Sequence, residues 1–330
     1  GQKIAWFSDE SGEYMLQVSH QDGKGETKKY KLMGAGFYDS PAWSPDNKKI
    51  CYHDNSSSLF IIDLESGKCQ KFSDYEEYNQ AQNAAWAPDS KWITYTLVDK
   101  NWLQRVFIYS LDKDKTYPIT DGMSDVFEPR FDASGKYLYF FGSTNAGPVR
   151  QWFDQSNADM KMTSNLYLTV LNKDSLSPLA KESDDEKPKA EETDKKKEDK
   201  DKDKDKGKAD VEKDKEVKTI IDLEGIANRI ISIPIPEGNY SNLQTGKEGE
   251  IYYVESPFSD LGGSESQPEL FMYNLKKRKS ESVLNVCNNY MISPDGSKIL
   301  YQSGTTWGIS NAGAKVDMSQ GKLNMSAIDI

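Results

Sequence analysis

The chain has 330 residues and a formal net charge of −11. This length allows one large all-β domain or two ordinary domains. The acidic balance argues against nucleic acids and anionic membranes as partners, because both bind basic surfaces. No apolar run approaches the ~18 residues of a membrane-spanning helix, and no signal peptide is present. We therefore expect a soluble chain and leave its compartment, cytoplasmic or periplasmic, open.

A short aromatic–Ser–Pro–Asp element recurs along the chain. It stands at residues 43–46 and 86–89 and returns, altered, at 131–134 and 292–295. The first two copies are 43 residues apart and the next follows after 45. A four-strand unit that recurs at this spacing is typical of β-propeller blades. We predict an all-β fold, a propeller of four-stranded antiparallel blades, in which six repeats are visible and six or seven blades form a single domain over residues 1–330.

The strands expected in each repeat follow the apolar patterns between turn signals. They are 4–7, 14–18 and 28–32; 42–44, 49–53, 59–64 and 69–72; 85–86, 92–97, 106–111 and 116–119; 137–141 and 165–171; 241–243, 251–254, 270–273 and 282–284; 298–302 and 306–310. The first repeat lacks its inner strand, and a last strand at 322–326 has no repeat of its own. We therefore predict that 323–325 pairs with 4–7 and closes the ring. Because the chain opens in mid-strand, we also expect an excised domain.

A charged segment interrupts the fourth repeat. Residues 181–218 hold 14 lysines and 16 acidic residues and almost no apolar side chain, so we expect a disordered or mobile insertion on the rim of the propeller. Residues 229–235 supply the outer strand that the fourth repeat still lacks, and Pro234 suits an edge strand. Within the insertion, four acidic residues nearly match a calcium loop, but Lys206 replaces its required glycine, and we interpret the match as chance. These acidic residues are Asp201, Asp203, Asp205 and Glu212.

The chain shows no catalytic motif, and we expect no catalytic residue, metal or cofactor in it. The three cysteines, of which Cys51 falls in an apolar strand pattern, form neither a disulfide framework nor a zinc site. His53 and His20, the two histidines, are interpreted as surface or blade-packing residues. The aromatic residues of the recurring element could line a channel, but their repetition favours packing between blades. As candidate ligand contacts we single out Arg150 and Trp152, in the long polar loop of the fourth repeat.

Three stretches resemble the tricorn protease family and its bacterial tricorn-like homologues. They are FSDESGEY at 7–14, DLEGIANRI at 222–230 with PIPEGNY at 234–240, and LNMS at 323–326. The second is the most specific, and the resemblance covers nearly the whole chain apart from the charged insertion. It implies a non-catalytic propeller, the second of two that precede a PDZ module and the catalytic domains of a serine peptidase. The implied role is to channel or filter peptides to and from an enclosed active site, with peptide substrates or products and those downstream domains as partners.

Two other functions remain open, because the recurring element is shared more widely. One is a TolB-like propeller that docks protein partners. The other is the propeller cap of a prolyl-oligopeptidase-type hydrolase. The number of blades is open as well, because the second propeller of the tricorn family has seven: either one blade precedes residue 1, or this homologue closes with six.

Overall fold

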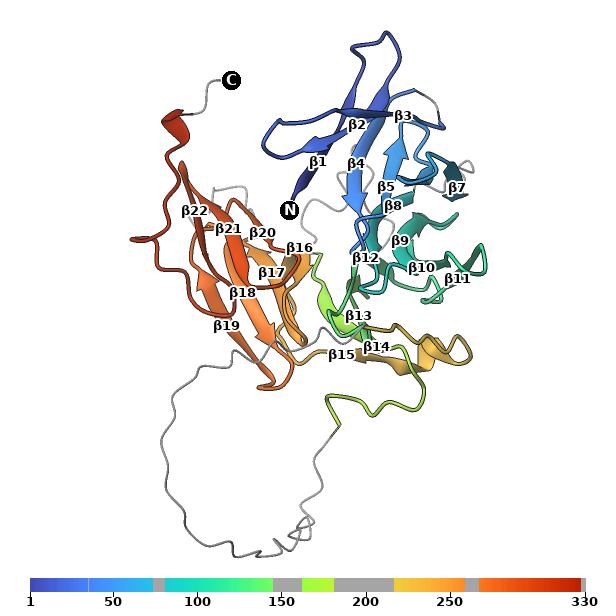
Figure 1. The fold of residues 1–330 in the computed structure, drawn as a ribbon. Helices are drawn as coiled ribbons and strands as arrows, with labels where there is room; N and C mark the ends of the chain where they lie inside the picture. The colour runs from blue at the N-terminus through green and yellow to red at the C-terminus, as the bar shows by residue number, and fades with distance from the viewer. Residues whose placement is uncertain (35, 74–80, 145–161, 181–216, 259–266, 328–330) are drawn as a thin grey trace, which may run out of the picture.

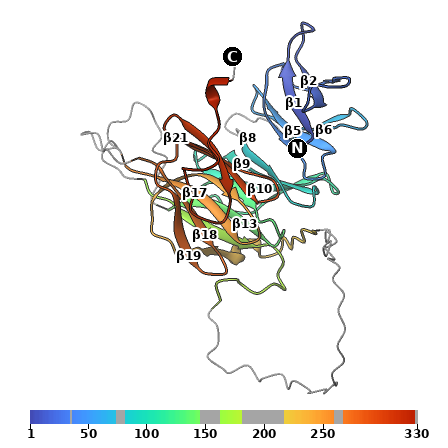
Figure 2. The same ribbon diagram turned by 60° about the vertical axis from the view of Figure 1, so that its left-hand side comes forward.

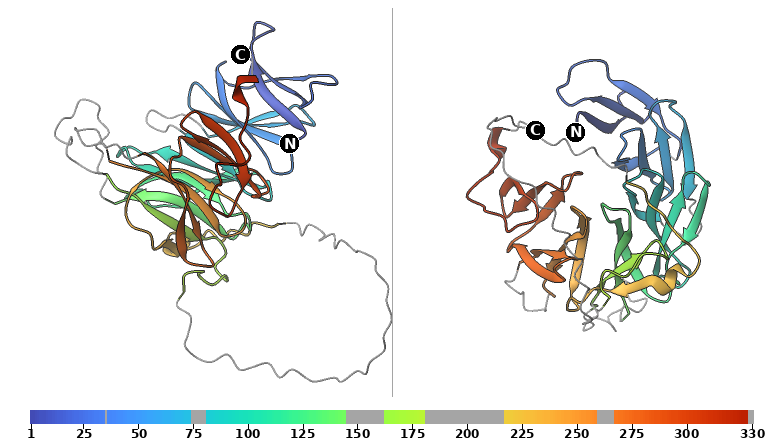
Figure 3. Two further views of the ribbon diagram at one scale, coloured as in Figure 1. Left: turned by 90° about the vertical axis from the view of Figure 1, so that its left-hand side faces the viewer. Right: turned by 60° about the horizontal axis from the view of Figure 1, so that its bottom comes forward.

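Six antiparallel sheets follow one another around a common axis and form a six-bladed β-propeller (Figure 1). The computed structural model describes residues 1–330 except 35, 74–80, 145–161, 181–216, 259–266 and 328–330. Seen along the axis, the blades fan out in chain order from the N-terminal to the C-terminal sheet (Figure 3). Within the described ranges, no helix has both the length and the apolar character needed to cross a membrane.

The strands agree with the predicted repeats to within a few residues. Blade 1 contains β1 (Lys3–Ser8), β2 (Met15–His20) and β3 (Lys28–Lys31), and blade 2 contains β4 (Tyr38–Trp43), β5 (Lys49–Asp54), β6 (Leu59–Asp63) and β7 (Cys69–Ser73). Blade 3 contains β8 (Ala81–Trp86), β9 (Trp92–Val98), β10 (Gln104–Ser110) and β11 (Lys115–Pro118), and blade 4 contains β12 (Asp125–Phe131), β13 (Tyr137–Ser143), β14 (Asn165–Val170) and β15 (Ile230–Ser232). Blade 5 contains β16 (Asn239–Thr245), β17 (Glu250–Ser256), β18 (Glu269–Asn274) and β19 (Lys279–Leu284), and blade 6 contains β20 (Asn289–Ile292), β21 (Lys298–Ser303) and β22 (Thr306–Asn311).

The recurring Ser–Pro–Asp element forms the corner between the first two strands of a blade. In blade 2 the Asn47 N–H donates to the Ser44 carbonyl at 2.9 Å, and the Ser44 N–H donates to the Lys49 carbonyl at 2.9 Å. Asn47 has a φ of 58°, so the corner is a tight turn that ends on a left-handed residue. In blade 6 this position is Gly296, with a φ of 65°, and an added Cβ would lie 2.6 Å from the Lys247 nitrogen of blade 5. Corners of adjacent blades therefore pack closely enough to require glycine there.

The core lies between the blades. Five clusters of buried side chains each join two successive blades, and the aromatic residues of the recurring element belong to them. Phe131 is 4% exposed, and the Trp86 indole N–H donates across the blade boundary to the Ala42 carbonyl at 3.0 Å. The four apolar residues of β6 are all buried, as expected for a strand covered on both faces. The packing interpretation of the recurring aromatics is thus confirmed.

The predicted closure of the ring is wrong. Among the described strands, β1 pairs only with β2, while the last segment runs back along its own blade. The Leu323 N–H donates to the Trp307 carbonyl at 2.9 Å, and Lys322 bridges Gly308. The segment follows β22 after a short connection, and closing a short loop costs less chain entropy than spanning the ring. Blades 1 and 6 therefore have three-stranded sheets, and the prediction of four strands holds for blades 2 to 5.

The fourth blade resumes after the charged segment, as predicted. β14 pairs with β15 through Leu168 and Ile231, although 59 residues, 171–229, lie between the two strands in sequence. A 3-10 helix, η2 (Ile226–Arg229), leads into β15. Arg229 ties the two sides of the insertion together, because its guanidinium donates to the carbonyls of Val170 at 2.9 Å and Glu224 at 2.9 Å. The described ends of the insertion contact different blades: Arg278 of blade 5 donates to the Ala180 carbonyl at 2.7 Å, and the Thr219 N–H donates to Oδ2 of Asp89 in blade 3 at 3.0 Å.

Candidate functional site: a polar pocket at the inner strands

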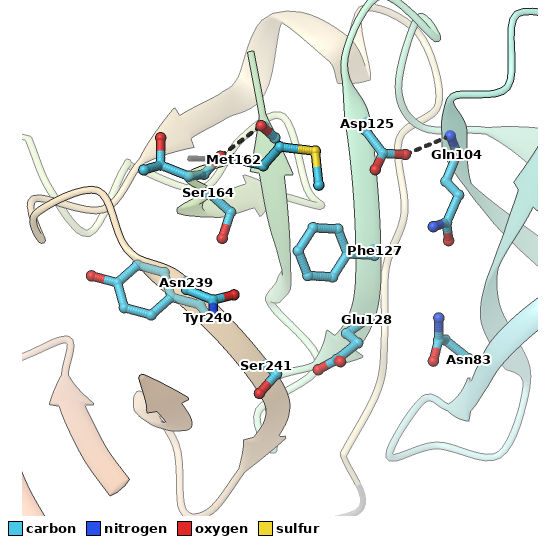
Figure 4. Close-up of a pocket in the computed structure, with 12 residues that line it drawn as sticks. Asn83, Gln104, Asp125, Phe127, Glu128, Met162, Ser164, Asn239, Tyr240 and Ser241 are labelled. Atoms are coloured by element: carbon cyan, nitrogen blue, oxygen red, sulfur yellow. Dashed lines mark hydrogen bonds between the residues drawn. The ribbon is translucent and has the colours of Figure 1, made fainter. Parts of the chain in front are cut away.

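A pocket of about 430 Å³ lies where the inner strands of blades 3, 4 and 5 meet. β8, β12 and β16 each contribute side chains to its wall (Figure 4). Residues at the beginning of β10, β12 and β16 and at the end of β13 also line it. These strand ends belong to the face of the propeller opposite the Ser–Pro–Asp corners. The pocket therefore opens on one face of the ring, beside its axis.

Bulges in the inner strands shape this wall. In β8, β12 and β16 the pairing register shifts, and in each case one residue has a left-handed backbone: Asn83 with a φ of 58°, Glu128 with 53° and Asn242 with 55°. A bulge turns the strand and changes the direction of its side chains. As a result Phe127 and Glu128, although consecutive, both line the pocket. Regular strand geometry would send them to opposite faces.

The bulges also join neighbouring blades. The Leu243 N–H of blade 5 donates to Oε2 of Glu128 at 2.6 Å. Nη1 of Arg130 donates to the Asn83 carbonyl of blade 3 at 3.3 Å, and the Tyr290 hydroxyl of blade 6 donates to the Asn242 carbonyl. These bonds hold the inner strands, and with them the pocket wall, in a defined position.

Asp125 and Gln104 line the pocket, and each has one polar atom that makes no hydrogen bond within the described chain. Asp125 is 7% exposed, and its Oδ1 accepts from the Gln104 N–H at 2.9 Å. Oε1 of Gln104 accepts from the Thr96 hydroxyl at 3.1 Å. Within the described part of the chain, Oδ2 of Asp125 and Nε2 of Gln104 have no hydrogen-bond partner. Both atoms point toward the interior of the pocket (Figure 4).

Aromatic rings also line the pocket, with Phe127 beside Asp125 on β12 and Tyr240 on β16. The Phe127 and Phe141 ring centroids lie 5.5 Å apart, and those of Phe141 and Tyr240 lie 5.8 Å apart. The Tyr240 hydroxyl donates to the Pro236 carbonyl at 2.6 Å. Burial, and to a lesser extent the carboxylate of Glu255, raises the pKa of Tyr240, so its hydroxyl stays protonated. The pocket thus combines an uncharged aromatic wall with carboxylate and amide groups.

Arg130 is the cationic residue adjoining this region, and the protein already uses it. Its guanidinium donates to the carbonyls of Pro129 at 2.8 Å and Asn83 at 3.3 Å. Burial lowers its pKa, and the nearby charge of Glu128 acts in the opposite direction. Arg130 is not among the residues lining the pocket, and no lysine or arginine of the described chain is. The wall therefore carries the charges of Asp125 and Glu128.

The candidate contacts expected from the sequence stay predictions. Arg150 and Trp152 lie outside the described residues, as do Asp201, Asp203, Asp205 and Glu212 of the calcium-like match. Among the described residues, no group of three or more potential metal ligands is present. No sequence pattern singled out Asp125 or Gln104, because each stands at the start of a strand with no recurring neighbour.

The histidines lie near carboxylates, and two of the three cysteines are buried. Nδ1 of His53 lies 3.7 Å from Oδ1 of Asp39, and burial lowers the pKa of the imidazole while Asp39 and Asp54 act in the opposite direction. His20 is exposed and lies 2.9 Å from Asp22. Cys51 is 2% exposed, as predicted, and burial raises the pKa of its thiol. All three cysteines are free thiols.

The blades and their connections define the chain as a β-propeller domain of the kind built from Ser–Pro–Asp repeats. Residues 1–313 match the family model described as the tricorn protease second beta propeller domain, and the chain belongs to this family. The resemblance inferred from the sequence is thereby confirmed. The match extends across the charged insertion and ends shortly after β22.

Curated relatives and solved structures agree with this family. The chain is 24% identical over 259 residues to a tricorn protease homolog of Saccharolobus solfataricus, covering 78% of this chain and 21% of that protein. It is 22% identical over 312 residues to tricorn protease homolog 1 of Streptomyces coelicolor, covering 90% and 27%. The chain thus spans about a quarter of the length of these relatives.

Solved structures with a similar fold include a member of the same family. The crystal structure of the tricorn protease matches with a TM-score of 0.68 and 17% identity over 98% of this chain and 30% of that chain. TolB from Acinetobacter baumannii matches with a TM-score of 0.52 and 16% identity over 94% and 60%. At these identities the structural likeness concerns the fold.

Proposed function

We propose that this chain is a non-catalytic propeller of a tricorn-like serine peptidase and that it guides peptides toward or away from the active site of the parent protein. In this proposal residues 1–330 form one domain that carries the charged insertion at about 181–218. The membership in the tricorn second-propeller family supports the peptidase context. The downstream PDZ and catalytic domains, and the peptide substrates or products, are the proposed partners.

The observation that carries the proposal is the pocket beside the ring axis. It offers hydrogen-bond donors and acceptors that the protein leaves unused, such as Nε2 of Gln104 and Oδ2 of Asp125. A peptide backbone presents both carbonyl and N–H groups, so it can pair with both. A volume of about 430 Å³ is in the range of pockets that hold a side chain or a small ligand.

Two measurements test this function. The chain is titrated with a mixture of short unstructured peptides, and binding is followed by calorimetry and by chemical shifts of residues at the pocket. Incubation with the same peptides should yield no cleavage products. Peptide turnover that a serine-directed inhibitor abolishes would contradict a non-catalytic role, and lack of any peptide binding would contradict the guiding role.

The TolB-like alternative is a propeller that docks folded protein partners, and its support is the similar fold of TolB. The propeller cap of a prolyl-oligopeptidase-type hydrolase is the other alternative. The coding sequence beyond residue 330 separates the three, because they require PDZ and peptidase domains, no sizeable domain, or an α/β-hydrolase domain. Copurification with a folded partner but not with peptides would favour the TolB-like function.

The blade number of the parent protein is part of the proposal. The outward face of blade 6 exposes Met291 by 64% and Ile309 by 44%, and β1 exposes Ile4 by 49%. Propeller blades normally cover such apolar faces with the next blade. A seventh blade between β22 and β1 would cover them, and the structure of the full-length protein tests this.

A further inference from the structure

The lining of the pocket has a net negative charge. Asp125 and Glu128 contribute carboxylates, and no described lysine or arginine lines the cavity. Oε2 of Glu128 accepts the Leu243 N–H, and the Glu128 side chain lines the cavity and extends toward Ser241 (Figure 4). A cavity with low-dielectric walls and charge of one sign concentrates ions of the other sign.

Asp125 is the residue that points to a ligand. It is more than nine-tenths buried, yet only one of its two carboxylate oxygens has a hydrogen bond within the described chain. The other oxygen, Oδ2, is open to the pocket and is not enclosed by protein atoms. A ligand in the pocket can therefore reach Oδ2 and donate a charge-assisted hydrogen bond to it.

The surrounding groups match an organic cation attached to a peptide. The Phe127 ring beside Asp125 provides an aromatic surface that attracts cations. The amide groups of Gln104 and Asn83 lie on the same side of the cavity and can donate to the carbonyl groups next to the cation. A divalent metal ion is less suited, because the described chain has no group of three potential ligands.

We propose that this pocket selects peptides by a positively charged group, which donates to Oδ2 of Asp125 and is further attracted by Glu128. The group is an ammonium or guanidinium, from a lysine or arginine side chain or from the peptide N-terminus. The proposal rests on the peptide-guiding function and names the peptide class that this function would favour.

The test uses the whole chain and a matched set of pentapeptides. N-acetylated and C-amidated peptides carry lysine, arginine or norleucine at the centre of four alanines, and a fourth peptide of five alanines has a free N-terminus. Dissociation constants are measured by calorimetry at low and high salt. We expect the lysine or arginine peptide, or the free N-terminus, to bind at least tenfold more tightly than the norleucine peptide, with a preference that falls as salt rises.

Variants locate the preference. Asp125→Asn keeps the size of the side chain and the acceptor for Gln104 but removes the charge, and it should abolish the preference. Glu128→Gln should weaken it less, and it provides a second test if Asp125→Asn does not fold. Asp112→Asn, on the other face of the propeller and exposed, changes the net charge equally and should have no effect. Urea unfolding of each variant verifies that it is folded.

The outcomes separate the two proposals. Equal binding of the norleucine and charged peptides, or an unchanged preference in Asp125→Asn, would overturn the cation selectivity and leave the peptide-guiding function standing. Failure of every peptide to bind would overturn both. Tight binding by the free-amine peptide alone would support the proposal and assign the N-terminus as the source of the cation.

Discussion

The buried carboxylate of Asp132 joins two blades, and its removal should destabilise the propeller strongly. Asp132 is 0% exposed and stands at the corner of blade 4, where Ser occupies the position in blade 2. Its Oδ2 accepts from the Tyr139 hydroxyl at 3.0 Å and from the Gly249 N–H of blade 5 at 2.8 Å. Its Oδ1 accepts from the N–H of Ser134 at 2.9 Å and also from the Ser134 hydroxyl.

The magnitude follows from the donors that would lose their acceptor. In Asp132→Ala the Tyr139 hydroxyl and the Gly249 N–H stay buried without a partner, and each such group costs about 1–3 kcal/mol. The donors of Ser134 are partly exposed and can bind water instead. We therefore expect a loss of about 4 kcal/mol in the free energy of unfolding. Domains are usually stable by only about 5–15 kcal/mol, so the effect should be large.

Urea unfolding followed by tryptophan fluorescence measures this loss. Asp295→Ala is the matched control, because Asp295 accepts similar bonds from Ser293 and Ser297 at the corner of blade 6 but is exposed to water. Asp132→Asn keeps the volume and one acceptor, and it should recover part of the loss. A decrease below about 1 kcal/mol for Asp132→Ala, or an equal decrease for the control, would refute the reasoning.

Three further predictions concern single groups. Cys69 is the partly exposed thiol, so Ellman's reagent should label it in the native protein and reach the two buried thiols only after unfolding; rapid labelling of all three would contradict this. Hydrogen bonds from Ser293 and, to a lesser extent, Ser297 lower the pKa of Asp295 from an ordinary value of 3.8 to about 2. The stabilisation that these bonds give the folded protein should therefore be present above pH 3.8 and be lost as the pH falls toward 2. Carboxyl NMR titration should show this midpoint and a higher one in Ser293→Ala; equal midpoints would contradict the assignment. Arg229→Ala should cost about 1–3 kcal/mol and speed amide hydrogen exchange near β15, because it removes donors to several carbonyls; Arg229→Lys should recover little, and full recovery would show that charge alone matters.

Local patterns along the chain were sufficient to predict the blades. The Pro–Asp corner and the apolar strands beside it depend on residues close in sequence, through turn bonds such as Asn47 to Ser44 and burial of both strand faces. The same reasoning recovered the interrupted fourth blade, because residues 229–235 had an apolar pattern that the insertion lacked. Burial of Cys51 followed from its place in such a strand.

Contacts between distant residues decided the rest. The bulge at Glu128 depends on a neighbouring blade, whose Leu243 N–H lies 115 residues further along the chain. The pocket polar groups acquire their surroundings only when three inner strands meet, so no short window of sequence contains the site. The partner of the C-terminal segment was likewise a choice between two free strand edges, β1 and β22. Both offer the same backbone groups, so the strand pattern alone did not choose between them, and in the assembled ring Leu323 lies beside Trp307.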